Sequence, residues 1–366
     1  MIPKTQKQWL VRGDKGFDYL EFQAEALIPS IGDRDVLVKS KGINFAASRS
    51  LNSTDADQMP LVHAVSLNSR DLLILKGLYP FPLKDSHVHL SDGAGVVAAV
   101  GSRVHRFRVG DRVATLSHQD HLAGPLDAKS RTSALGSSLD VVLREYGVFT
   151  EHGLVNVPEN LSLLEASSLP SAALTAWNAL YGLEGMVSRQ CDTVLTEGTG
   201  GVSIFAMQFA KSAGAKVIAT TSTAQRAERL KELGADYWGE PAKNSTPNKE
   251  RVSAVVEVGG PASLRQALTA LKFDGSISMV GSVGGFVDPG SNTEEPTFFD
   301  TVIHSCTLRG TAVGSRLQFE DMNRAIAVND LHPVLDRQIL KLEEAREAYQ
   351  YIWDQKHFGK VILEIV

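Results

Sequence analysis

The sequence predicts an α/β protein in which a doubly wound parallel sheet is combined with a β-rich domain. The clearest observation is the stretch from Thr193 to Thr221, where a short apolar run, a glycine turn, a helical pattern and a second β-branched run follow one another. In addition, short β-branched runs punctuated by glycines occupy residues 8–40 and 91–113. The length of 366 residues allows two domains.

Composition disfavours several classes of partner. The chain is 43% hydrophobic and 22% charged with a formal net charge of −5, which argues against a nucleic acid or an anionic membrane surface as its main partner. Its two cysteines, Cys191 and Cys306, cannot form a disulfide framework. The first residues lack a signal-peptide core, and no apolar run reaches the ~18 residues of a spanning helix. We therefore expect a cytoplasmic protein without a membrane partner.

The N-terminal part of the sequence is typical of strands separated by turns. Runs at residues 8–13, 19–28 and 35–39 predict an antiparallel or mixed sheet. Residues 41–63 are polar and hold neither the helical nor the strand period, so we expect an atypical loop or disordered insert, either native or translated from an unspliced intron. Strand-like sequence resumes at residues 64–83.

The glycine turn is the strongest functional motif. Gly198, Gly200 and Gly201 lie between a predicted strand and a helix that opens near Val202, while Ser203 replaces the third glycine of the usual pattern. Glycines let the backbone approach a pyrophosphate, and the unpaired amides of a helix N-terminus favour its negative charge. The turn predicts a dinucleotide site; the alternative is an ordinary glycine-rich βα turn.

The end of the second strand indicates which dinucleotide binds. NAD sites usually place Asp or Glu about 20 residues after the glycine turn to bind the ribose hydroxyls. The segment from Thr220 to Arg226 contains no acid. Thr221, Ser222 and Arg226 can instead donate hydrogen bonds to a 2′-phosphate, so we expect NADPH or NADP as the cofactor. The alternatives are turn chemistry for the hydroxyls and a solvated helix face for Arg226.

Later patterns complete the sheet and return the chain to the first domain. The segment between Tyr237 and Arg251 has little room for the helix of a parallel crossover. Further strands and helices are predicted at residues 251–258, 275–280, 307–315, 321–327, 341–351 and 360–363.

Several motifs together resemble a known family. They are Gly93-Ala-Gly95-Val-Val97, Gly110-Asp111-Arg112-Val113, LPSAALTAWNALYG at 169–182, the GTGGVS turn, LGAD at 233–236, VVEVGG at 255–260 and GKVIL at 359–363. Over nearly its whole length the sequence resembles the medium-chain dehydrogenase/reductase superfamily. The resemblance implies a GroES-like catalytic domain over residues 1–165, a Rossmann NADP-binding domain over 166–315, and a return to the catalytic domain over 316–366.

The residues at the family's zinc positions differ from the usual ligands. Many members hold a catalytic zinc through a Cys, a GHE motif and a later Cys or Asp, whereas this sequence has Asn68 at the first position and Ser91-Asp92 near the second. The loop from His118 to Asp140 contains no cysteine for a structural zinc site. The chain therefore resembles the zinc-independent branch of quinone oxidoreductases and enoyl reductases, and we expect no metal. The less favoured alternative is a histidine site at His87/His89 or His118/His121.

The resemblance also implies where hydride transfer takes place. It implies that Asn68 and Thr175 lie near the nicotinamide, and Arg70 and Tyr79 are further candidate donors to the substrate oxygen. Leu73 stands where related quinone reductases often carry a tyrosine, which leaves the proton donor unassigned. Each donor could alternatively serve a turn or a helix cap. Cofactor contacts in the later segments are expected at Gly281, Ser282, Thr311, Val313 and Lys360.

These features favour an NADP(H)-dependent oxidoreductase that transfers a hydride to an activated C=C or C=O bond of a small carbonyl or enone substrate. The resemblance further implies a homodimer that pairs through the last sheet strand, residues 307–315. Two alternatives stay open: an alcohol dehydrogenase that acts oxidatively, and an NADPH-binding protein with little catalysis.

Overall fold

The computed structural model describes residues 2–13, 16–39, 63–80, 83–84, 87–139, 142–183, 192–239, 251–281 and 296–365. The chain divides into two compact units, which are Met1–Pro170 with Asp336–Lys356 and Val361–Val366, and Ser171–Leu335 with His357–Lys360. The insert predicted at residues 41–63 lies outside the described residues except for His63, as do Ser282 and most of the short crossover after Tyr237.

The first unit is the predicted β-rich fold. Its strands are β1 (Thr5–Val11), β2 (Leu20–Leu27), β3 (Asp35–Lys39), β4 (His63–Ser66), β5 (His87–Val88), β6 (Asp92–Val100), β7 (Arg112–Thr115), β8 (Tyr146–Thr150), β9 (Leu154–Asn156), β16 (Leu335–Lys341) and β17 (Lys360–Ile365). Its helices are η1 (Phe17–Tyr19), α1 (Ser69–Leu75), α2 (Ala128–Arg131), η2 (Glu151–Gly153), α3 (Leu163–Ala166), η5 (Leu342–Glu344) and α10 (Ala345–Trp353). Among the described strands, one sheet has the order β16-β17-β4-β6-β3-β8 with β7 and β9 attached through β6, and β2-β1-β5 form another.

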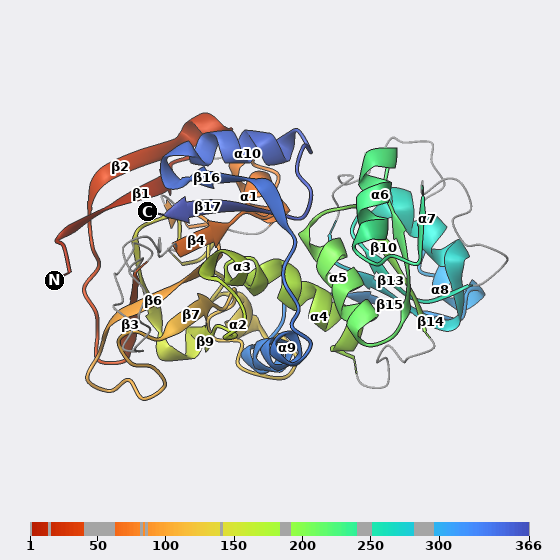
Figure 1. Cartoon of the computed structure of the whole chain (residues 1–366), viewed down its shortest axis with the longest axis horizontal. Helices are drawn as coiled ribbons and strands as arrows, with labels where there is room; N and C mark the ends of the chain where they lie inside the picture. Colours follow the sequence, from red (N-terminus) through yellow and green to blue (C-terminus); the bar gives the residue numbers. More distant parts are fainter. Residues whose placement is uncertain are drawn as a thin grey trace, which may run out of the picture. The chain divides into compact units, whose positions relative to one another are not determined.

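Segments far apart in the sequence close this unit. The indole Nε1 of Trp9 in β1 donates to the carbonyl of Leu342 at 2.8 Å in a buried hydrogen bond. The rings of Phe17 and Tyr349 stack with centroids 5.8 Å apart. In Figure 1 the red strands β1 and β2 accordingly lie beside the blue helix α10. The N-terminal strands and the C-terminal helix therefore share one core.

One predicted strand region is partly a helix. The apolar pattern over residues 64–83 predicts strand, but only β4 is extended and α1 follows it. The prediction is wrong here because the backbone N–H of Asn68 donates to Asp71 Oδ2 at 2.7 Å, which caps the helix start. The apolar residues that follow face the core from one side of the helix: Leu72, Ile74 and Leu75 are buried.

The second unit contains a single parallel sheet in the described ranges. Its strands are β10 (Thr193–Glu197), β11 (Lys216–Thr220), β12 (Tyr237–Gly239), β13 (Val252–Glu257), β14 (Leu271–Met279) and β15 (Thr307–Gly310). Its helices are α4 (Leu174–Tyr181), α5 (Gly201–Ser212), α6 (Ala224–Glu232), α7 (Pro261–Ala270), α8 (Asp300–Ile303) and α9 (Arg316–Val328), and η3 (Leu169–Ala173) leads into α4 from the first unit.

The order of the described strands, β12-β11-β10-β13-β14-β15, is that of a Rossmann fold. The predicted strand, turn, helix and strand from Thr193 to Thr221 are confirmed as β10, α5 and β11. The strand order changes direction between β10 and β13: β11 and β12 lie on one side of β10, and β13, β14 and β15 lie on the other. In such sheets, ligands bind at this point, at the carboxyl ends of the strands.

The second unit extends further along the chain than the sequence suggests. Helix α9 packs against α4, and the unit runs to Leu335 rather than to residue 315. None of the described helices combines the length and apolar character that crossing a bilayer requires.

Candidate functional site

The glycine turn after β10 has the geometry of an anion-binding loop. Gly198 adopts a φ of 77°, a conformation that glycine tolerates best, and its N–H donates to Thr220 O at 2.8 Å. Helix α5 begins at Gly201, and its second residue is the predicted contact Val202. A side chain at Gly200 would meet no atom within 4 Å, so this face of the turn is open. Gly200, Gly201 and Val202 are partly exposed, so the start of α5 can be approached by a phosphate group.

A segment from late in the chain supports the turn from the other side. The N–H of Gly359 donates to Thr199 O at 2.9 Å. Lys360 is 3% exposed, and a Cβ atom at Gly201 would lie 2.5 Å from Lys360 Cδ and 3.1 Å from Ala172 Cβ. A larger residue at position 201 would therefore displace the buried Lys360 side chain, and the predicted cofactor residue Lys360 lies directly against the turn.

The predicted 2′-phosphate residues follow β11 at the same end of the sheet. Thr221 is buried and its N–H donates to Gly239 O at 3.0 Å, whereas Ser222 is exposed. Arg226 lies in the first turn of α6, and its Nη2 donates to His357 O at 3.2 Å. This segment thus carries an exposed Ser222 hydroxyl, a buried Thr221 hydroxyl and the Arg226 guanidinium, and it contains no acid.

Other predicted cofactor residues also lie at the carboxyl ends of strands. Gly281 follows β14, and Thr311 and Val313 follow β15. The N–H of Thr311 donates to Met279 O at 2.8 Å, and its buried hydroxyl has no partner in the described part of the chain. Such a group is available to a ligand. Thr175 is buried in α4 of the same unit.

Two glutamates that the sequence patterns did not single out end adjacent strands. Glu197 ends β10 and Glu257 ends β13. Burial, followed by the charge of Glu257, raises the pKa of Glu197 to about 8. The sequence pattern that could have identified them is an acidic residue at the end of each predicted strand, followed by a glycine within the next two residues.

The predicted catalytic residues lie in or near α1 of the first unit. Asn68 caps the helix. Arg70 Nη2 donates to Leu135 O at 2.7 Å and lies 3.8 Å from Asp71 Oδ1, so part of its guanidinium holds a neighbouring loop. Tyr79 is half-buried in the segment after the helix. The catalytic roles of these three residues stay predictions.

The positions that match zinc ligands in the family carry a different set of donors. Ser91 Oγ donates to Asp92 Oδ1 at 2.7 Å, and both residues are fully buried. Together with the Asn68 amide, these groups supply neither the thiolate nor the imidazole that holds a catalytic zinc, so they do not fit this ion. In the described ranges, no three His, Cys, Asp or Glu side chains gather in a way that could hold a metal.

His89 and His121, one histidine from each candidate pair, have contacts within the first unit. His121 Nε2 lies 3.0 Å from Gly124 O, and His89 Nε2 lies 3.3 Å from Asp71 O. Burial, followed by the positive charge of Arg70, lowers the pKa of His118 to about 4. The His118 ring is therefore neutral near pH 7.

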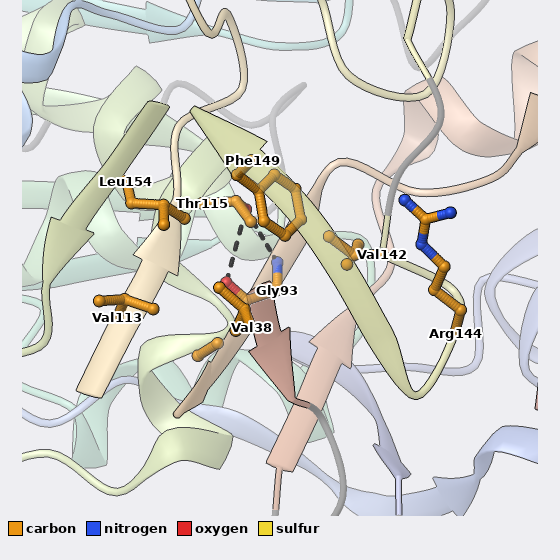
Figure 2. Close-up of a pocket in the computed structure, with 10 residues that line it drawn as sticks. Val38, Gly93, Val113, Thr115, Val142, Arg144, Phe149 and Leu154 are labelled. Carbon is orange, nitrogen blue, oxygen red and sulfur yellow. Dashed lines mark hydrogen bonds between the residues drawn. The ribbon is translucent and has the colours of Figure 1, made fainter. Parts of the chain in front are cut away.

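The small cavity in Figure 2 is not the predicted site. It lies inside the β-rich unit, where Val38, Phe149 and Leu154 surround it and Thr115 Oγ1 accepts a hydrogen bond from Gly93 N at 3.1 Å. Its volume of ≈ 10 Å³ accommodates about one water molecule. A second hollow of ≈ 300 Å³ in the same unit has mostly polar and charged residues in its lining. No predicted catalytic or cofactor residue lines either of these two cavities.

Comparisons with known proteins agree with this architecture. The alcohol dehydrogenase GroES-like domain model matches residues 61–159, and the zinc-binding dehydrogenase model matches residues 201–328. A zinc-type alcohol dehydrogenase-like protein of Schizosaccharomyces pombe is 38% identical over 360 residues, which are 96% of each chain. The acryloyl-coenzyme A reductase of Metallosphaera sedula is 28% identical, over 82% of this chain and 90% of the relative. The crystal structure of a candidate alcohol dehydrogenase from Sinorhizobium meliloti 1021 has a TM-score of 0.82 at 33% identity and covers 100% of both chains.

Two neighbouring glycines of the turn should respond differently to substitution. Gly201→Ala should lower the free energy of unfolding by about 1–3 kcal/mol, because the new methyl group overlaps Lys360 and crowds Ala172. Gly200→Ala should leave stability nearly unchanged, since its Cβ enters open space, yet it should weaken binding of a nicotinamide dinucleotide. Denaturant unfolding and fluorescence titration measure the two effects. Equal stability of both variants, or undiminished affinity in Gly200→Ala, would contradict this geometry.

Proposed function

Because the chain belongs to the medium-chain dehydrogenase/reductase superfamily of oxidoreductases, we propose that it is a zinc-independent, NADP(H)-dependent reductase of activated C=C or C=O bonds. The substrate class is an enone, quinone or aldehyde. The observation that carries the proposal is the donor set at the family's zinc positions, where Asn68, Ser91 and Asp92 offer an amide, a hydroxyl and a buried carboxyl group. The name of a relative, acryloyl-coenzyme A reductase, supports the choice of reaction, because an acryloyl group contains an activated C=C bond.

Catalysis without a metal depends on position and hydrogen bonding. The bound nicotinamide supplies the hydride. The glycine turn and the N-terminus of α5 would hold the pyrophosphate, and Thr221, Ser222 and Arg226 would hold the 2′-phosphate. Hydrogen bonds from Asn68, Arg70 or Tyr79 to the substrate oxygen stabilise the charge that develops on it during transfer.

Alcohol oxidation is the second candidate function, and the alcohol dehydrogenase-like name of the Schizosaccharomyces pombe relative favours it. The proposed compartment is the cytoplasm, because a chain with two cysteines and no disulfide framework suits a reducing environment.

The reaction class and metal independence can be tested together. Purified protein should oxidise NADPH with at least one member of a panel of quinones, enones and aldehydes, at a rate that a chelator does not change, and elemental analysis should find no stoichiometric zinc. Activity that a chelator abolishes and zinc restores would overturn metal independence. Reduction of NADP by alcohols alone would favour the second candidate, and tight NADPH binding without turnover would favour a non-catalytic protein.

The cofactor preference gives a second test. NADPH should bind at least ~10-fold more tightly than NADH, equivalent to about 1.4 kcal/mol, because the segment from Thr221 to Arg226 offers donors and no acid. Arg226→Ala should remove most of this preference. NADH, which lacks the 2′-phosphate, is the control for the same variant. An equal loss of affinity for NADPH and NADH would show that Arg226 acts through its hydrogen bond to His357 O and not by binding the 2′-phosphate. Equal affinities in the wild type would refute the NADPH assignment.

We also infer that the chain forms a homodimer through the edge of the second unit's sheet. Strand β15 is last in the order of the described strands, so one of its sides is an edge available for pairing. Close before it in sequence, Phe298 and Val302 are 78% and 70% exposed, and Phe299 and Ile303 are similarly exposed. A cluster of exposed apolar side chains is typical of a protein interface, and twofold contact between two copies would bury it.

A charge in this apolar cluster should weaken the dimer. Val302→Asp should raise the dimer dissociation constant at least ~10-fold, about 1.4 kcal/mol, because the carboxylate would lose its water in the interface. Val109→Asp, at a 61% exposed position of the first unit, is the matched control and should remain dimeric. Sedimentation velocity distinguishes the two states. A monomeric wild type, or an unaltered dimer in Val302→Asp, would contradict the proposed interface.

A further inference from the structure

Two carboxyl groups lie at the ends of β10 and β13, the two neighbouring strands between which the strand order of the second unit changes direction. Strands β10 and β13 pair in parallel with Thr196 opposite Val256, so the next residues, Glu197 and Glu257, end the two strands side by side. Gly198 follows the first glutamate directly and begins the glycine turn. The pair is therefore next to the pyrophosphate-binding loop and part of the same edge of the sheet.

The hydrogen bonds of Glu257 join this pair to a second glycine turn. Glu257 is fully buried, and its Oε1 accepts hydrogen bonds from Gly259 N at 2.7 Å, Gly260 N at 2.9 Å and Ser263 Oγ at 2.7 Å. The Oε2 atom of Glu257 and the Oε2 atom of Glu197 are both buried and have no donor in the described part of the chain. Two buried acceptors on adjacent carboxyl groups are satisfied if one proton lies between them.

The neighbouring elements supply no alternative partner of opposite charge among the residues in register with the pair. Thr220 of β11 lies opposite Glu197, and Met279 of β14 lies opposite Glu257. Helix α7 contributes the Ser263 hydroxyl, and α5 contributes Ser203, whose Oγ donates to the main-chain oxygen of Glu197 at 2.5 Å. The groups that act on the Glu197 carboxyl are the Glu257 carboxylate, the Val258 amide and the Ser263 hydroxyl.

We propose that Glu197 and Glu257 share one proton, and that this carboxyl pair is a positioning device that holds the glycine turn of residues 198–201 beside the turn of residues 258–260 in the arrangement that binds the cofactor. The inference rests on the proposed cofactor-dependent function. Glu197 and Glu257 act through the two turns and take no part in hydride transfer.

The shared proton links cofactor binding to pH. Loss of the proton leaves two negative charges side by side next to the anionic pyrophosphate, which weakens binding. The pKa of Glu197, raised to about 8 by burial and then by Glu257, sets the range. Affinity for NADPH is therefore full below this pKa and falls as the pH rises through it, by up to about tenfold per pH unit for one linked proton. The stability of the folded protein also decreases as the pH rises. Because the pKa of Glu197 in the folded state lies above the ordinary glutamate value, its contribution to the free energy of unfolding is complete below the ordinary pKa and is lost as the pH rises through about 8.

The test compares Glu197→Gln with Glu232→Gln, which makes the same chemical change on the exposed surface of α6. NADPH affinity is measured by fluorescence titration from about pH 6 to about pH 9.5, a range that spans the raised pKa. Wild type and Glu232→Gln should lose affinity at high pH, whereas Glu197→Gln should be nearly independent of pH, since its amide donates to Glu257 without a titrating proton. A flat wild-type profile, or the wild-type slope in Glu197→Gln, would overturn the proposal.

Two measurements without cofactor separate this inference from the proposed function. Infrared difference spectra of the wild type should show a protonated carboxylic acid at neutral pH that titrates near pH 8 and is missing in Glu197→Gln. Thermal unfolding of the free protein should show a stability that falls between about pH 4.5 and about pH 8 in wild type and Glu232→Gln. Absence of NADPH binding at every pH would refute the cofactor function, while the infrared band would still decide the carboxyl pair. Without that band in wild type, the shared proton is disproved even if Glu197→Gln fails to fold.

Discussion

The parallel register between β10 and β13 is the constraint on which the cofactor face of the second unit depends. It sets the level at which both glycine turns leave the sheet, and from this level α5 begins, Glu257 holds the amides of Gly259 and Gly260, and the segment around Gly359 reaches Thr199. A shift of one residue would displace these groups by about 3.3 Å along the strand, which is more than a hydrogen bond tolerates. The register of the two strands thus also determines the positions of the glycine turns and of Glu257 at the carboxyl end of the sheet.

In the first unit, the positions that hold zinc in many family members have structural hydrogen bonds instead. Asn68 caps the start of α1, with Asp71 as the reciprocal cap, and Asp92 accepts a bond from Ser91 inside the sheet. Buried polar groups are costly without partners, so these hydrogen bonds stabilise the polar side chains inside the sheet and at the start of the helix. The same residues therefore define the local fold of this region of the first unit.

Much of the second unit could be predicted from the sequence because each pattern that identifies its elements spans only a few adjacent residues. Strand β10, the glycine turn and α5 each follow from a few adjacent residues, and so does the acid-free end of β11. Helix α1 was missed because the apolar run from Leu72 to Leu75 suits a strand as well as a helix, and the choice is made by the cap at its start. The pairing of Glu197 with Glu257 and the contact of Lys360 with Gly201 depend on residues brought together by the sheet and the returning chain, which no local period reveals.

The hydrogen bond from Gly359 to Thr199 also constrains the order in which the protein can mature. The two residues are separated by 160 positions, so the nucleotide loop leaves the ribosome long before the segment that braces it has been translated. The contact that braces the loop can therefore form only after residues 357–360, the last part of the second unit, have been synthesised.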